Sequence, residues 1–136
     1  MLTVRYTTSW GEDVELALYA DSYEATGGRA ICAVEVPSGT GDGGEEDGGL
    51  ELWNVLTVCL TDPLSLEWCA DPSHVIIDTN NNERRLVDAL VADGVIRMTG
   101  GWSASGFCRY PHAVLSERAL EALAGYEELA AAIAAS

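Results

Sequence analysis

The sequence contains no lysine, and all seven of its basic side chains, apart from two histidines, are arginine. Against them stand 22 aspartates and glutamates, so the chain of 136 residues carries a formal net charge of −15 at pH 7. A codon bias toward G and C explains the missing lysine most simply. A negative charge of this size repels nucleic acid, which argues against direct nucleic-acid binding.

The sequence also lacks a long apolar run. No window approaches the roughly 18 uninterrupted apolar residues that a membrane span needs. The N-terminal segment MLTVRYTTSWGEDVEL does not combine a basic region with an apolar stretch, as a signal peptide does. We therefore expect a cytoplasmic protein, in which the four cysteines are reduced because their spacing does not match a disulfide framework. These cysteines are Cys32, Cys59, Cys69 and Cys108.

Length and composition predict one α+β domain over residues 1–136, since 48% hydrophobic residues is normal for a folded globule. The expected architecture is a mostly antiparallel sheet with one or two packed helices. Residues 61–73 hold two prolines and read as irregular. Strand patterns are found at 2–8, 13–19, 29–36, 51–60, 74–79, 95–99 and 107–110.

Two segments show helical periodicity. The first begins at Glu83 and ends at Gly94, and we expect its Arg84 to pair with Asp88. The second is expected over 116–134, with Ser116 as its cap and alanine and leucine at helical spacing. The apolar stripe of the first helix consists of Leu86, Val87, Leu90 and Val91.

Most of the acid lies in the first half of the chain. From Glu12 to Asp78, fifteen acidic residues face one arginine, Arg29. Segment 37–49 has six glycines and four acids and nothing to bury, so we expect a mobile acidic loop.

Carboxylates on strands can approach the charge spacing of DNA. Alternate strand residues are about 6.6 Å apart and neighbouring strands about 4.8 Å apart. DNA carries one phosphate about every 3.4 Å along each strand. We expect an acidic partner-binding face in which the 37–49 loop extends the strand residues. Its members are Asp13, Glu15, Glu35, Asp42, Glu45, Glu46, Asp47 and Glu51.

Four short motifs occur in a recognisable order: LTVCL at 56–60, IDTNNN at 77–82, TGG at 99–101 and SGFCRYP at 105–111. Over about residues 50–115 the chain resembles a family of small uncharacterised proteins carried on mobile elements of Gram-positive bacteria. The acidic glycine-rich insert and the alanine-rich final helix depart from that pattern. The resemblance implies a setting of plasmids, phages and conjugative elements, and no catalytic role.

Charge and setting together predict a non-enzymatic inhibitor without a cofactor. It would be an anti-CRISPR or anti-restriction protein that mimics the charge of DNA and blocks a basic, nucleic-acid-binding host defence complex such as a CRISPR surveillance complex. The alternative is an accessory factor that binds protein through an aromatic patch, while its acidity serves solubility alone. Salt separates the two, because it weakens contacts between exposed charges. The aromatic candidates are Trp53, Trp68, Trp102 and Tyr110.

The corner IDTNNN could present Asp78, Asn80 and Asn81 to a ligand, but capping and turn chemistry explain it better. Asparagine tolerates turn conformations, and its side chain bonds nearby backbone groups. We expect Asn81 or Asn82 to cap the following helix.

Two catalytic or metal constellations can be written down, and neither is expected. Cys69 with His74, and Cys108 with His112, have ligand-like separations but no zinc knuckle, so we expect no metal site. The segment GWSAS (101–105) lacks the second glycine of a nucleophile elbow. That leaves a Ser103–His74–Asp78 hydrolase group without support.

Overall fold

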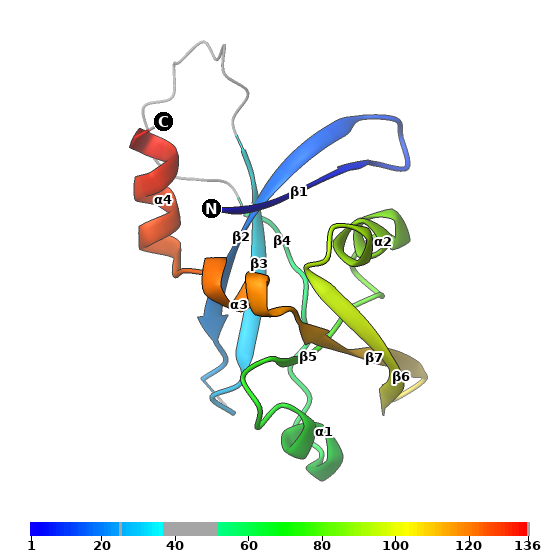
Figure 1. Ribbon diagram of the computed structural model, residues 1–136. Helices are drawn as coiled ribbons and strands as arrows, with labels where there is room; N and C mark the ends of the chain where they lie inside the picture. The colour runs from blue at the N-terminus through cyan, green and yellow to red at the C-terminus, as the bar shows by residue number, and fades with distance from the viewer. Residues whose placement is uncertain (25, 37–51, 136) are drawn as a thin grey trace.

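The computed structural model describes residues 1–24, 26–36 and 52–135 (Figure 1), and its architecture confirms the α+β class. No helix in these ranges is long and apolar enough to cross a membrane. The strands are β1 (Leu2–Thr7), β2 (Asp13–Ser22), β3 (Arg29–Glu35), β4 (Leu52–Val55), β5 (His74–Ile76), β6 (Ile96–Ser105) and β7 (Cys108–Leu115). The helices are α1 (Pro63–Trp68), α2 (Arg84–Ala92), α3 (Glu117–Ala122) and α4 (Tyr126–Ala135).

The strands form two antiparallel sheets where one was expected. The first has the order β1-β2-β3-β4, and the second has the order β5-β7-β6. Segment 56–58 joins them, because Leu56 N donates to Ile31 O of β3 and Val58 N donates to Ile76 O of β5. The strand that was expected over 51–60 is therefore divided. Its first part is β4, and the residues that follow form this bridge between the sheets.

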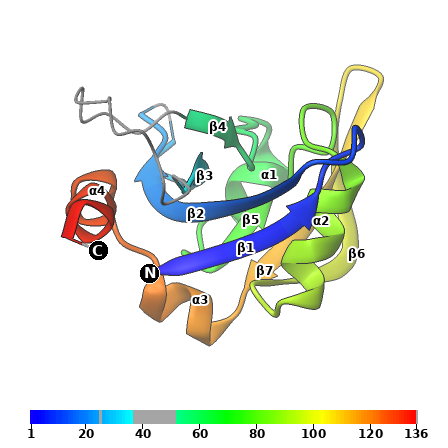
Figure 2. The ribbon, with the colours of Figure 1, turned by 90° about the horizontal axis from the view of Figure 1, so that it is seen from above.

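The core lies between the two sheets and α2. Alternation in β2 turns Val14, Leu16 and Leu18 inward, as their spacing predicts. Helix α2 packs against β1 and also contacts β6 (Figure 2), where its buried face consists of Leu86, Val87 and Leu90. Each such buried leucine contributes about 1.5–3 kcal/mol to stability. Val91 was expected on this face but is exposed.

Gly94 follows α2 as predicted, with a φ of +74° that favours glycine. The predicted Arg84–Asp88 pair is also present, at 3.8 Å on the exposed side of the helix.

The C-terminal segment was expected to be one helix over 116–134, and this is wrong. Ser116 caps α3, since its Oγ accepts from Ala119 N at 3.1 Å, but the helix ends before Leu123, whose backbone is extended. The carbonyl of Ala124 then accepts from Ala20 N of β2. This detour places α4 on the outer face of the first sheet, on the side away from α2 (Figure 1), with Leu129 packed on Ala17 and Val34.

Segment 61–73 was read as irregular but contains α1. Asp62 Oδ2 accepts from Ser65 N at 3.2 Å, and Pro63 occupies the first helical turn, where its missing N–H costs nothing.

Short strands were expected at 95–99 and 107–110, but the glycine-rich segment between them is also largely strand. Strand β6 runs through it to Ser105 and pairs with β7 beyond a register shift between Met98 and Trp102. Gly100 has a φ of +89° within that shift, and Gly106, with a φ of +62°, lies in the turn of the hairpin.

Candidate functional site

The asparagine corner forms a turn held by its own side chains. Asp78 Oδ1 accepts from the backbone N of Asn80 and of Asn81, and its Oδ2 accepts from Asn81 Nδ2. Asn82 is buried, and its Nδ2 donates to Val55 O of β4 and to Asp78 O. The prediction that Asn81 or Asn82 caps α2 is wrong: the cap residue is Glu83, without a side-chain cap hydrogen bond.

The described members of the expected acidic face do not share a face. Asp13 and Glu15 alternate with the inward residues of β2, so they point away from the core. Glu35 pairs with Leu16 and therefore lies on the opposite side of the sheet from Glu15. Glu15 also forms an ion pair with Arg5 at 3.6 Å. The remaining members, Asp42, Glu45, Glu46, Asp47 and Glu51, lie outside the described residues.

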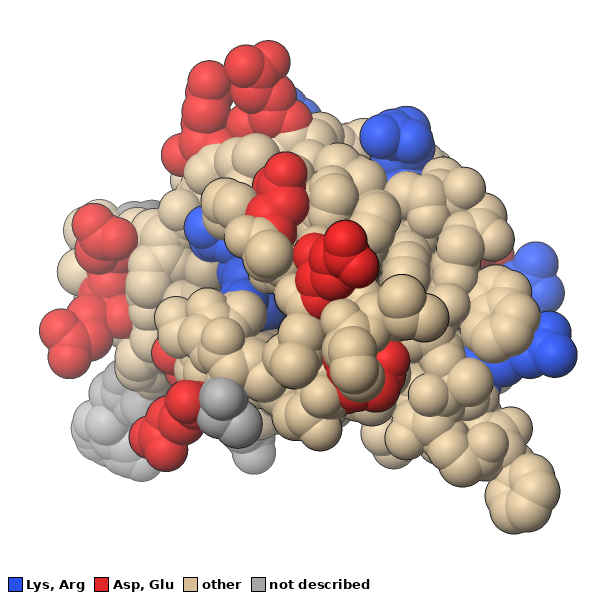
Figure 3. Space-filling view, turned by 90° about the horizontal axis from the view of Figure 1, so that it is seen from below, with Lys and Arg blue, Asp and Glu red and all other residues tan. Residues whose placement is uncertain are grey.

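Acidic side chains are distributed over the surface and few of them pair with arginine. The described residues include seventeen aspartates and glutamates and seven arginines. In this part of the chain, arginine pairs with a carboxylate in two places, Arg5–Glu15 and Arg84–Asp88. Figure 3 shows acidic side chains, both singly and in small groups, on the side of the molecule that carries α1. Most of the negative charge is therefore uncompensated.

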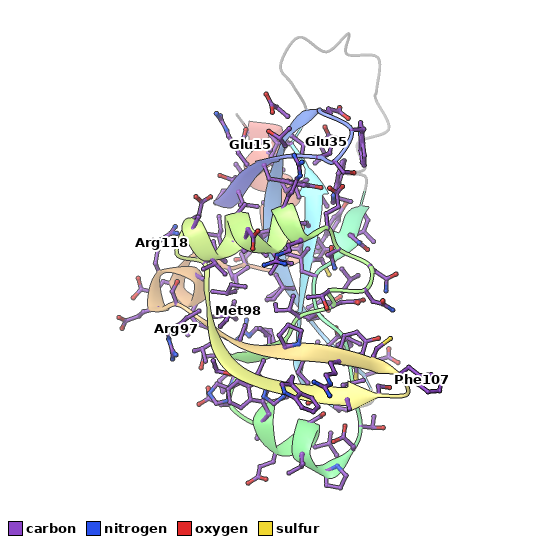
Figure 4. The ribbon with its side chains drawn as sticks, turned by 90° about the vertical axis from the view of Figure 1, so that its right-hand side faces the viewer. Glu15, Glu35, Arg97, Met98, Phe107 and Arg118 are labelled. Carbon is purple, nitrogen blue, oxygen red and sulfur yellow. The ribbon has the colours of Figure 1, made fainter. Side chains whose placement is uncertain are left out.

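A cavity of about 640 Å³ opens between α1, β5 and the β6–β7 hairpin. It lies at the end of the molecule opposite Glu15 and Glu35 (Figure 4). Two carboxylates, two tryptophans and two histidines contribute to its lining, together with Ser103 and small or apolar groups. These six are Asp62, Glu67, Trp68, Trp102, His74 and His112.

A stack of three rings builds one wall of the cavity. The pairing of Ile76 with His112 puts His74 and His112 on the same sheet face, toward α1. The Trp68 ring centroid lies 3.8 Å from that of His74 and 4.5 Å from that of His112, in nearly parallel planes. Trp68 Nε1 donates to Val75 O at 3.0 Å, and His74 Nδ1 lies 2.8 Å from Trp68 O. The indole is therefore held firmly.

A chain of short hydrogen bonds runs behind this wall. Ser65 Oγ lies 2.7 Å from Asp62 Oδ1 and 2.8 Å from Ser103 Oγ, and Ser103 Oγ lies 2.7 Å from His112 Nε2. A carboxylate only accepts, so Ser65 Oγ donates to Asp62. The same hydroxyl is the donor toward Ser103 Oγ, and the direction of the Ser103–His112 bond depends on the tautomer of the ring.

The two end groups of this chain favour opposite charge states. The hydrogen bond from the Ser65 side chain lowers the pKa of Asp62, with further help from backbone N–H groups. Burial lowers the pKa of His112, and His74 lowers it further, while Asp62 opposes the shift. At neutral pH the chain thus joins a carboxylate to an uncharged imidazole.

The arrangement is unlike that of an activated serine. A general base for the serine must be held in place by a third group, as a carboxylate does in a catalytic triad. In the described part of the chain, no carboxylate hydrogen-bonds to His112 Nδ1. The Ser103–His74–Asp78 group is not assembled, because His74 bonds Trp68 and Asp78 bonds the asparagine turn.

The cysteine and histidine pairs do not converge either. Nowhere in the described ranges do three or more His, Cys, Asp or Glu side chains gather as metal ligands, and all four cysteines are free. His74 and His112 lie instead in the ring stack.

The four aromatic candidates do not form one patch. Trp68 and Trp102 line the same cavity, but Trp53 packs on the core and lines a separate hollow with Trp10. Tyr110 is half-buried and lines neither. Trp102 is half exposed, and the guanidinium carbon of Arg109 lies 4.2 Å from its ring centroid.

Sequence reasoning missed Ser65 and the cavity, because both depend on α1. The signal that predicts α1 is Asp62-Pro63, a capping residue followed by proline at the first helical position.

Comparison of the chain with protein-family models, with curated proteins and with solved structures found no match. The resemblance to mobile-element proteins stays a prediction.

Proposed function

We propose that this protein is a non-enzymatic cytoplasmic inhibitor that binds a basic, nucleic-acid-binding complex and occupies the surface where nucleic acid would bind. The resemblance to mobile-element proteins favours a host defence complex, of the CRISPR or restriction type, as the target. The uncompensated negative charge is the observation that carries the proposal. With two Arg–carboxylate pairs for seventeen described acids, most carboxylates are available to a cationic partner.

The described carboxylates do not form one flat strip with DNA-like spacing, since Glu15 and Glu35 lie on opposite sides of a sheet. The proposal therefore rests on long-range attraction and on many separate contacts. Such attraction raises the association rate and weakens as salt screens it.

A capture experiment from host lysate tests the proposal. The tagged protein is immobilised at low salt, and bound material is then challenged with high salt or with excess duplex DNA. Mimicry predicts that a basic nucleic-acid-binding complex is retained and that both challenges release it. Retention through high salt and DNA would contradict mimicry.

An accessory factor that binds protein through aromatic contacts is the second candidate, and exposed aromatic side chains on the β6–β7 hairpin favour it. Trp102 is 50% exposed, and Phe107 projects fully from the tip of the β6–β7 hairpin (Figure 4). Isolated exposed apolar residues are common on soluble proteins, so this evidence is weaker than the charge. Capture that resists salt but is lost in Trp102→Ala would favour this candidate.

A further inference from the structure

The cavity beside α1 combines negative charge with flat aromatic surface. Asp62 and Glu67 are exposed carboxylates, and Trp68, Trp102 and His112 supply rings. Among the described residues, no arginine lines the cavity. Ser65 donates two hydrogen bonds to Asp62, from its backbone N–H and from its hydroxyl, and part of the carboxylate stays open to solvent. Within the described chain, Glu67 has no ion pair with an arginine.

This composition selects a cation. A phosphate or carboxylate ligand would meet two like charges, and no arginine among the described lining residues would offset them. A cation gains from the two carboxylates and from the faces of the indoles, which attract positive charge. The neutral state of His112, whose pKa burial lowers, adds no repulsion at neutral pH.

Among cations, the guanidinium group fits best. It is planar, stacks on aromatic rings and binds carboxylates through two parallel hydrogen bonds, whereas an ammonium group is a compact point charge. The chain's own Arg109 already lies over Trp102 at 4.2 Å, so this indole accepts a guanidinium.

We infer that the cavity receives an arginine side chain presented by the partner protein. The inference rests on the proposed function, which supplies a basic partner, and it names the contact that would add specificity to long-range charge. Arginine anchors in pockets are frequent hot spots of protein interfaces.

A titration followed by NMR tests the inference, because the four tryptophans divide into two pairs. The probe is N-acetyl-arginine N-methylamide, and the signals are the indole N–H groups. Trp68 and Trp102 line the cavity and should shift, while Trp10 and Trp53 line a separate hollow and should not. The isosteric citrulline derivative, which lacks the charge, should leave all four signals in place.

Variants locate the binding. Glu67→Gln should weaken binding of the arginine probe about threefold, as expected for an exposed ion pair. Glu121→Gln, on α3 outside the cavity, is the matched control and should leave it unchanged. The lysine derivative should bind more weakly than the arginine probe.

Three results would overturn the inference: shifts at Trp10 and Trp53 as large as those in the cavity, equal effects of the two glutamine variants, or much tighter binding of free arginine than of the blocked probe. The last result would make the ligand an amino acid instead of a protein side chain. None of these results affects capture of a DNA-displaceable complex. If the capture fails instead, the proposed function is wrong, but the titration result remains valid.

Discussion

Ser103 Oγ and His112 Nε2 lie 2.7 Å apart, and the same hydroxyl lies 2.8 Å from Ser65 Oγ, which donates to Asp62. Ser65 belongs to α1, whereas Ser103 and His112 lie on β6 and β7. A distance typical of a catalytic pair thus belongs to a longer chain of hydrogen bonds. Here the chain holds the cavity wall to α1.

The lack of a carboxylate on His112 Nδ1, within the described residues, predicts that Ser103 is not an activated nucleophile. A fluorophosphonate probe should leave the protein unlabelled at neutral pH, because no third group orients the imidazole as a base. Intact-mass measurement checks this, with Ser103→Ala as the control. Stoichiometric labelling that is lost in the alanine variant would show instead that Ser103 is activated.

The lowered pKa of His112 predicts a pH dependence of stability. Because the ring is harder to protonate in the folded chain than in the unfolded chain, where its pKa is about 6.5, the unfolded state takes up the proton first. The free energy of unfolding should therefore fall as pH decreases through and below about 6.5. Between about pH 8 and about pH 5.5, most carboxylates remain ionised and contribute little.

Urea unfolding of the wild type and of His112→Gln at the two ends of this range measures the effect. The other groups near His112, which are His74 and Asp62, are present in both proteins. The variant should lose part of the pH-dependent fall. An identical fall in both proteins would show that His112 does not contribute.

Asn82 should be important for stability although it lies in a polar turn. Its side chain is buried and donates to Val55 O at 3.0 Å and to Asp78 O at 2.9 Å. Asn82→Ala leaves two carbonyls without these donors, which should lower the free energy of unfolding by about 1–3 kcal/mol. Thr79→Ala, at an exposed position of the same turn, should change it by less than about 0.5 kcal/mol. Equal values for the two variants would contradict the assignment.

Much of the fold follows from local patterns in the sequence. The alternation of Val14, Leu16 and Leu18 predicts β2, and the 3.6-residue spacing of Leu86 and Leu90 predicts α2. Such elements form because one of their faces is buried, and a short stretch of the sequence shows which residues make up that face. Gly94 and Ser116 mark helix ends because their roles are local as well.

The remaining features depend on contacts between distant segments. The carbonyl of Ala124 accepts a hydrogen bond from β2, and this contact sets the break between α3 and α4. Because β2 lies far away in the sequence, the residues around Ala124 do not predict the break. The two-sheet arrangement depends on hydrogen bonds of segment 56–58 to β3 and β5. The cavity needs α1, β5 and the β6–β7 hairpin together, so no local pattern shows that the histidine next to Ser103 is His112.

The acidic first half of the chain makes the sharpest prediction for function. Reversing four of its exposed acids to arginine should abolish capture of the basic complex, because attraction becomes repulsion. These acids are Asp13, Asp21, Glu24 and Glu35. The matched control reverses four exposed acids of α3 and α4, which changes the net charge by the same amount. Its positions are Glu117, Glu121, Glu127 and Glu128.

Binding of the captured complex by these two variants, with folding of each verified by circular dichroism, is the most direct measurement of the central claim. The first variant should lose binding, and the control should keep most of it. Equal binding by both variants, whether retained or lost, would contradict a specific role for the acidic half and would leave the charge a matter of solubility.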